Sequence, residues 1–145
     1  MSDVTVRRLT RDDLPFCTRL AADVLRSAEV ATDRLRELLE DSRSIVLAAQ
    51  VRDVPVGYVV SYCFPSLSGE RLAYLYDIEV LADWRRQGVA RMLVGGAVVR
   101  VPASGRREHL EAGSSLTNMA ACELWRATGA QRDGDQYVEF TFELT

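Results

Sequence analysis

The segment from Tyr74 to Arg91 constrains the fold most, because a β-rich run passes directly into a turn rich in arginine and glycine. An apolar repeat at helical spacing follows, so the segment predicts a strand, a tight turn and a helix in succession. The first backbone N–H groups of such a helix lack partners within it, and the helix dipole adds positive potential there. Gly88 allows close backbone approach, while Arg85 and Arg86 add charge. The segment predicts a diphosphate site, although the same letters taken alone also fit a loop with solvated arginines.

Hydrophobic periodicity along the whole chain predicts a mixed α/β fold in a single domain spanning residues 1–145. The expected strands cover residues 4–9, 44–51, 56–64, 71–81, 108–112 and 137–144. The expected helices cover residues 14–25, 33–41, 86–100 and 118–128. The element order is then βααβββαβαβ. Hairpin turns are expected at Arg52-Asp53-Val54-Pro55 and at Asp133-Gly134, just before the last strand.

Composition excludes several function classes. The 18 basic residues are all arginine, and with 21 acidic residues the net charge is −3 at pH 7. Nucleic-acid binding requires an excess of positive charge, so no nucleic-acid partner is expected. Because lysine is absent, Schiff-base chemistry and a phosphate-binding lysine of the Walker type are excluded.

The cysteine, histidine and apolar residues argue against a metal site and against insertion into a membrane. Three scattered cysteines and one histidine, His109, are too few for a zinc site, so no metal is expected. No apolar run approaches the roughly 20 residues of a membrane span, and residues 1–10 have no signal-peptide core. We therefore expect a cytoplasmic protein that does not enter a membrane.

Two motifs in the chain are similar to the signature of the GNAT superfamily of acetyl-CoA-dependent N-acetyltransferases. The element Gln/Arg-x-x-Gly-x-Gly/Ala after a central strand is matched by Arg85, Gly88 and Ala90. A later helix that opens at Asn and ends in aromatic-x-x-x-Gly is matched by Asn118, Trp125 and Gly129. The resemblance covers nearly the whole chain. It implies a mixed, mostly antiparallel central sheet flanked by helices, with acetyl-CoA as co-substrate in a V-shaped opening between two central strands.

The resemblance also implies a role for each part of these motifs. Backbone amides of residues 86–91 would hold the CoA pyrophosphate, while main-chain groups of Ile78 and Val80 would pair with pantetheine. The amide of Val80 would also stabilise the oxyanion of the tetrahedral intermediate. Asn118 would hydrogen-bond the pantetheine arm, and it equally suits the start of a helix. The implied cofactor-binding residues are Ile78, Val80, Arg85, Arg86, Gln87, Gly88, Val89, Ala90, Arg91 and Asn118.

A narrower resemblance points to the small aminoglycoside 3-N-acetyltransferases. It is carried chiefly by the run Tyr74-Leu75-Tyr76-Asp77 before the phosphate turn. Two positions depart from the pattern. Trp125 replaces the usual tyrosine, and an indole N–H cannot act as a general acid at neutral pH, which leaves open what reprotonates the CoA thiolate. The chain also reads Gly113-Ser114-Ser115 where that group carries acidic residues, which removes negative charge from the expected acceptor pocket.

Asp77 and Glu79 are the candidate bases, because an amine attacks only when neutral and a carboxylate can take its proton. Period-2 alternation predicts both acids on one face of the 71–81 strand. The residues expected on the other face are Tyr74, Tyr76, Ile78 and Val80. Glu79 is preferred because it lies nearer the expected acetyl end, and Asp77 is the alternative; pairing of either acid with an arginine is the competing interpretation. Glu111 and Tyr62 are expected on the acceptor side; the competing interpretations are a solvated acid at the end of a strand for Glu111 and an ordinary sheet residue for Tyr62.

The resulting hypothesis is direct transfer of acetyl to a primary amine of a small cationic molecule, with an aminoglycoside as the sharpest expectation for the acceptor. One alternative is a protein N-terminal or side-chain acetyltransferase. A second is a non-catalytic acyl-CoA-binding sensor, which would have no use for the pair of acids at Asp77 and Glu79. The resemblance further suggests a homodimer formed through the late strands.

Overall fold

A mostly antiparallel sheet divides the molecule into two layers of helices. The computed structural model describes residues 3–101, 109–115, 117–132 and 140–144. Within them the sheet has five strands in the order β1-β2-β3-β4-β5. The strands are β1 (Thr5–Arg8), β2 (Ser44–Val51), β3 (Val54–Pro65), β4 (Arg71–Val80) and β5 (His109–Ala112). β1 to β4 pair antiparallel, and β5 runs parallel to β4.

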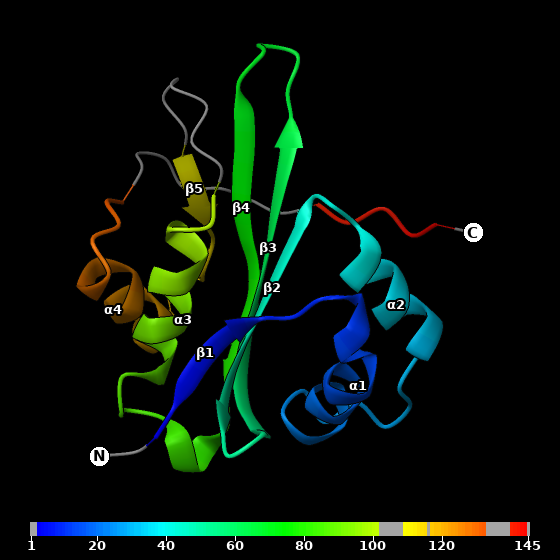
Figure 1. The fold of residues 1–145 in the computed structure, drawn as a ribbon. Coiled ribbons are helices and arrows are strands. Elements are labelled where there is room, and N and C mark those ends of the chain that lie inside the picture. Colours follow the sequence, from blue (N-terminus) through cyan, green and yellow to red (C-terminus); the bar gives the residue numbers. More distant parts are fainter. Residues whose placement is uncertain (1–2, 102–108, 116, 133–139, 145) are drawn as a thin grey trace.

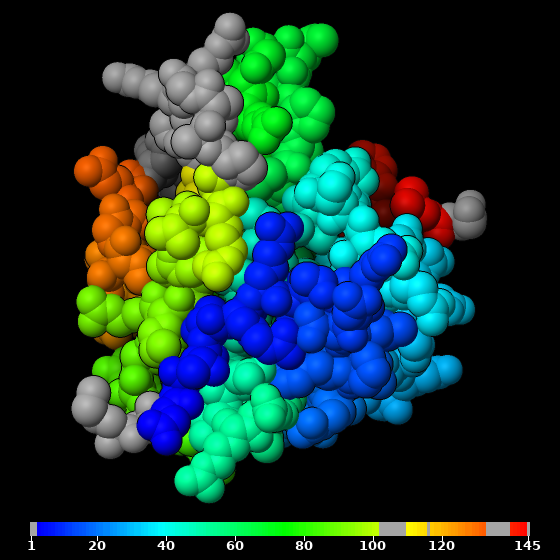
Figure 2. All heavy atoms as spheres, in the orientation of Figure 1, coloured from blue at the N-terminus to red at the C-terminus, as the bar shows by residue number. Residues whose placement is uncertain are grey.

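Helices cover both faces of this sheet, as Figure 1 shows. The helices are α1 (Leu14–Asp23), α2 (Thr32–Glu40), α3 (Val89–Val98) and α4 (Met119–Ala127). Short 3-10 turns precede α1 (η1, Arg11–Asp13) and follow β4 (η2, Ala82–Trp84). In Figure 2, α1 and α2 form one part of the surface, and α3 and α4 form another. The mixed α/β fold class and the mostly antiparallel sheet expected from the sequence are confirmed.

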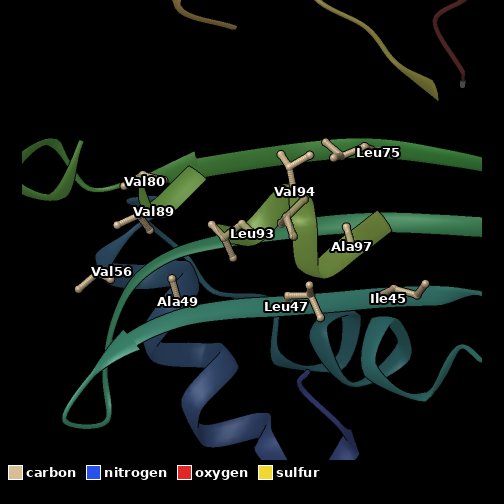
Figure 3. Packing of buried hydrophobic residues seen from close by; sticks show 11 residues of the cluster. Ile45, Leu47, Ala49, Val56, Leu75, Val80, Val89, Leu93, Val94 and Ala97 are labelled. Atoms are coloured by element: carbon tan, nitrogen blue, oxygen red, sulfur yellow. The ribbon is translucent and has the colours of Figure 1, made fainter. Parts of the chain in front are cut away.

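The larger apolar cluster lies between α3 and the sheet. Leu93 and Ala97 of α3 have no exposed surface and pack on Leu47 and Val59 of the central strands. Figure 3 shows the side chains of α3 pointing onto the strands in this layer. The first residue of the helix, Val89, is also buried here. Because burial of a large aliphatic side chain contributes about 1.5–3 kcal/mol, this contact fixes the start of α3 against the sheet.

A β-bulge in β4 changes which side chains share a face. Val60 of β3 pairs with Asp77 and the next residue, Ser61, pairs with Leu75, so Tyr76 is an extra residue on β4. Leu75 and Val80 accordingly both belong to the cluster beneath α3, although strict alternation would put residues five apart on opposite faces.

The bulge corrects the alternation expected from the sequence. Ile78 and Val80 lie on the α3 side, as expected. Tyr74 and Tyr76 do not join them. Both line a hollow beside the end of α2 together with Tyr62, which packs against the cluster on the α1 and α2 side. The extra residue at Tyr76 inverts the alternation, so both tyrosines share the face of Asp77.

The described part of the expected last strand, residues 140–144, does not form a strand. Its apolar residues Phe140, Phe142 and Leu144 are 84–95% exposed. Alternation produces a strand only where an edge is available to pair with it, and no described strand pairs with this segment. Residues 133–139, including the expected Asp133-Gly134 turn, lie outside the described residues, as does Glu108 at the start of the expected fifth strand.

Candidate active site

The turn between β4 and α3 has the backbone geometry expected of an anion site. Gly88 is the N-cap of α3 and has a φ of 84°, and Arg86 has a φ of 62°. The Gly88 carbonyl accepts the first helical hydrogen bond from the Met92 amide at 3.0 Å. The amides of residues 89–91 thus lie in the first turn, where no helical carbonyl is available to them. This end of α3 can hold the diphosphate of CoA through backbone N–H groups and the helix dipole.

Side chains around the turn make contacts with neighbouring elements. Gln87 donates to the Asp83 carbonyl at 2.8 Å, which braces the turn. Arg86 forms an ion pair with Glu123 at 3.5 Å, but its side chain remains 84% exposed. Arg91 donates to a carbonyl of α4 at 3.3 Å. Both arginines lie at the surface beside the first turn of α3, where they add positive potential.

Arg85 stabilises the end of β4. Its Nε donates to the Val80 carbonyl at 2.8 Å, and its Nη2 contacts the Glu79 Oε1 at 2.7 Å. Pairing of one of the two acids with an arginine was the competing interpretation of the sequence, and the structure shows this pairing for Glu79. The pair lines a hollow of about 380 Å³ between the end of α1 and the end of β4.

The outer edge of β4 is free at its C-terminal half. β5 pairs with β4 only through residues 72–75, although β4 continues to Val80. Figure 1 shows β5 beside only one part of the longer strand. Among the described residues no strand pairs with this outer edge of β4 along residues 76–80. The Val80 carbonyl already accepts from Arg85, but the other main-chain groups of this edge, including the amides of Ile78 and Val80, can pair with an extended ligand.

Asp77 has a buried hydrogen-bond donor. The hydroxyl of Tyr58, a buried residue of β3, donates to Asp77 Oδ2 at 2.7 Å. Burial raises the pKa of Tyr58, and the hydrogen bond to Asp77 and the charges of Asp77 and Glu79 raise it further. The phenol is therefore a neutral donor across the physiological range. Among the described residues no cation forms an ion pair with Asp77, in contrast to Glu79.

A second hollow of about 380 Å³ lies on the same face. It is lined by Asp41, Arg43, Tyr62, Phe64, Tyr74 and Tyr76, and we call it the aromatic hollow. The rings of Tyr62 and Tyr76 meet edge to face, with centroids 5.9 Å apart. Tyr62 was expected on the acceptor side. The other lining residues were not assigned to the acceptor, because the bulge and the approach of α2 to β3 are long-range effects without a local sequence signal.

The remaining predicted residues lie around β5 and α4. Glu111 is exposed and sits beside Tyr74 in register. Asn118 caps α4, accepting from the Ala121 amide at 3.1 Å, so its helix-start role is present. Trp125 packs partly against the α3 cluster, and its indole N–H donates to Ser114 Oγ at 3.2 Å. Tyr58 was not predicted from the sequence as a site residue, because it contacts Asp77 across neighbouring strands and the two residues are 19 positions apart in the chain.

The described ranges contain no candidate metal centre and no membrane-spanning helix. No group of three or more histidine, cysteine, aspartate or glutamate side chains there is placed to hold a metal ion. In the same part of the chain, no helix has the length and apolar character needed to cross a membrane.

Comparisons with known proteins bear on this arrangement. Residues 6–130 match the model of the acetyltransferase (GNAT) family. The aminoglycoside acetyltransferase meta-AAC0020 from an uncultured soil metagenomic sample, solved with trehalose, has a TM-score of 0.82 at 25% identity, covering 98% of this chain and 97% of that one. AAC(6')-Iy, solved with the bisubstrate analog CoA-S-monomethyl-acetylneamine, has a TM-score of 0.78 at 18% identity, covering 99% and 100%.

Another similar structure is that of an enzyme named for a protein acceptor. Ribosomal-protein-alanine N-acetyltransferase from Brucella melitensis biovar Abortus 2308 has a TM-score of 0.70 at 23% identity, covering 96% of this chain and 99% of that one. No curated protein matches the chain in sequence. The family model nevertheless spans most of the chain, including the β4–α3 turn and the free edge of β4. The chain therefore belongs to the acetyltransferase (GNAT) family and is an N-acetyltransferase.

Proposed function

We propose that the protein transfers the acetyl group of acetyl-CoA directly to a primary amine of a small cationic molecule, with Asp77 as the residue that binds the amine and accepts its proton. The observation that carries this proposal is the Tyr58–Asp77 contact of 2.7 Å beside the free edge of β4. The aminoglycoside acetyltransferases among the similar structures support a small-molecule acceptor, and aminoglycosides belong in the first panel of amines tested.

The backbone at both ends of the opening fits acetyl-CoA. The first-turn amides of α3 would hold its diphosphate, and the edge of β4 at Ile78 and Val80 would pair with its pantetheine arm. The amide of Val80 would face the acetyl oxygen, where an N–H donor stabilises developing negative charge. When bound, acetyl-CoA supplies the acetyl group as a thioester; the C–N bond to the amine forms as the C–S bond breaks.

Asp77 is favoured over Glu79 as the base because of their partners. Glu79 is paired with the Arg85 guanidinium at 2.7 Å, so an ammonium group would compete with a cation already in place. Asp77 accepts from a neutral phenol, which orients one oxygen and leaves the other available. The proposal reverses the order of preference drawn from the sequence, and assigns Glu79 to the stabilisation of the β4 end.

The test compares two matched amide variants. We expect Asp77→Asn to lower kcat/KM for an acetylated amine by about 10²–10⁴-fold, the usual range for loss of a general base, with CoA affinity unchanged. Glu79→Gln should lose less than tenfold. Release of the CoA thiol is followed with aminoglycosides, polyamines, simple alkylamines and short peptides. Thiol release that no amine accelerates, despite CoA binding, would refute the proposal, and equal activity of Asp77→Asn and wild type would refute the assignment of the base.

A further inference from the structure

The composition of the aromatic hollow restricts the acceptor. Four of its six lining residues are aromatic, from β3 and β4, and its volume of about 380 Å³ lies at the lower end of the range of about 300–1,000 Å³ for small-molecule pockets. Tyrosine and phenylalanine rings gain most from contact with another ring or with a flat apolar group. The hollow therefore offers more ring surface than hydrogen-bonding sites for hydroxyl groups.

The charged residues of the hollow neutralise each other. Arg43 Nη2 lies 2.8 Å from Asp41 Oδ2, while its Nε and backbone amide donate to Oδ1 at 3.0 and 2.9 Å. This pairing lowers the pKa of Asp41 to about 2. Glu111 lies beside Tyr74 in register but does not line the hollow. The lining thus presents no uncompensated carboxylate for a second ammonium group.

The hollow lies on the same face of the sheet as Asp77, because its lining residues Tyr62 and Tyr74 pair two positions along β3 from the Val60–Asp77 pair. The bulge places Tyr76 and Asp77, which are consecutive residues, on the same face of β4. Tyr62 is near both Asp41 and Asp77: burial raises the pKa of Tyr62, and the charges of Tyr76, Asp41 and Asp77 raise it further. An amine bound at Asp77 would accordingly extend the rest of its structure over the rings of Tyr76 and Tyr62.

We infer that the preferred acceptor is a monoamine carried on an aromatic or flat apolar body, which fills the aromatic hollow while Asp77 holds the amino group. This inference rests on the proposed function, because it takes Asp77 as the amine site. It narrows the substrate class from small cationic molecules in general and disfavours polycationic sugars, whose further ammonium groups would find Asp41 already paired with Arg43.

Direct binding tests the inference independently of turnover. Dissociation constants of 2-phenylethylamine, hexylamine and kanamycin are measured by calorimetry with the full chain. We expect 2-phenylethylamine to bind at least several-fold more tightly than the other two. Replacing one ring, in Tyr62→Leu or Tyr76→Leu, should weaken its binding by roughly twofold to tenfold and leave hexylamine unchanged. Leu67→Ala, in the exposed β3–β4 turn, is the control and should change neither constant.

A gain of binding gives a second test. Arg43→Gln releases the Asp41 carboxylate, so we expect it to raise the affinity for kanamycin by about twofold to fivefold, the upper part of the range of an exposed ion pair. Equal binding of 2-phenylethylamine and hexylamine, or tighter binding of kanamycin by wild type, would overturn the inference. If kanamycin or hexylamine is nevertheless acetylated, the proposed function stands. If 2-phenylethylamine binds with the expected preference and no amine is acetylated, the proposed function fails and the binding preference is retained.

Discussion

Asp77 and Glu79, which are separated by one residue on β4, have different hydrogen-bond partners and therefore different proposed roles. Glu79 meets a guanidinium contributed by the turn that follows its own strand, whereas Asp77 meets a phenol contributed by β3. An ion pair at the surface contributes little, about 0–1 kcal/mol, but it occupies the carboxylate. A neutral buried donor orients a carboxylate and leaves its charge for a substrate cation. The proposed choice of base thus depends on residues that contact the two acids only in the folded chain.

Tyr58→Phe tests whether the phenol positions Asp77. The ring stays in the cluster beneath α1, but the carboxylate loses its donor at 2.7 Å. We expect kcat to fall about tenfold with the KM for acetyl-CoA unchanged, because hydrogen bonds to charged groups contribute about 1.5–3 kcal/mol. Steady-state kinetics and CD spectra measure the effect. An unchanged kcat in a less stable protein would assign Tyr58 a structural role only.

Ser61→Ala is the matched control on the same strand, since it also removes one hydroxyl group. Ser61 is fully buried, and its Oγ has no hydrogen-bond partner among the described residues. An unpaired buried hydroxyl costs about 1–3 kcal/mol, so the free energy of unfolding should rise or stay constant. Urea denaturation measures the stability of both variants and steady-state kinetics measure their kcat. A fall in kcat is expected for Tyr58→Phe but not for the control, Ser61→Ala.

At the level of elements, local periodicity predicted most of the fold. β2 was expected at residues 44–51 and lies there, and α2 and α4 differ from expectation by one residue at each end. The β-bulge at Tyr76 was not predictable, because an extra residue is defined only by pairing with β3. The same limit applied to the last expected strand: alternation is local, whereas an edge that accepts a strand depends on the whole sheet.

The candidate site was predicted unevenly for the same reason. The β4–α3 turn and its Gly88 are local features, and the expected geometry is present. The contacts of Arg85 with Glu79 and of Tyr58 with Asp77 depend on how side chains meet after folding. The local geometry of the proposed CoA site was therefore easier to predict from the sequence than the contacts on the proposed acceptor side.

Gly88→Ala tests the α3 terminus. A Cβ at Gly88 would meet no atom within 4 Å, so the cost arises from its φ of 84°, about 1–2 kcal/mol for an L-residue. Relief of that strain would shift the first-turn amides. We expect CoA affinity to fall about tenfold, measured by calorimetry, together with lower stability. Unaltered CoA affinity would show that these amides do not hold the diphosphate.

Gly95→Ala in the same helix is the control. A Cβ there also meets nothing within 4 Å, and the residue lies in the helix interior. Because alanine favours a helix by about 0.8–1.0 kcal/mol over glycine, we expect this variant to be more stable and to bind CoA as wild type does.

For the whole molecule, the proposed function places the two substrates on different sides of the sheet. The start of α3 and the free edge of β4 would form the CoA side, where arginines gather. The face beneath α1 and α2 carries Asp77, Tyr58 and the aromatic hollow. On the proposed function, the small net charge of −3 would thus conceal a division into an anion-binding end and an amine-binding face. Both meet at β4, where the acetyl group would pass from one substrate to the other.

The absence of lysine makes the alkaline stability of the molecule unusually simple to interpret. Lysine ordinarily titrates near pH 10.4, and arginine stays protonated, so cysteine and tyrosine dominate the alkaline range. Burial, and to a lesser extent the charge of Asp13, raises the pKa of Cys17 from 9.0 to about 11. The pKa of Tyr58 is raised in the same direction.

A raised pKa on a group that is neutral when protonated means that the folded state holds the proton more tightly than the unfolded chain. The stabilisation by Cys17 is fully present below pH 9.0 and is lost as the pH rises to about 11. We expect the free energy of unfolding, from urea denaturation, to fall by about 2–3 kcal/mol across this window through Cys17, with a further fall through Tyr58 at higher pH. Cys17→Ala should be less stable at pH 7 but should lose less stability between pH 9 and 11. An equally steep decline in that variant would show that the Cys17 thiol is not linked to folding, and would leave Tyr58 and Tyr62, whose pKa values are also raised, as the groups responsible.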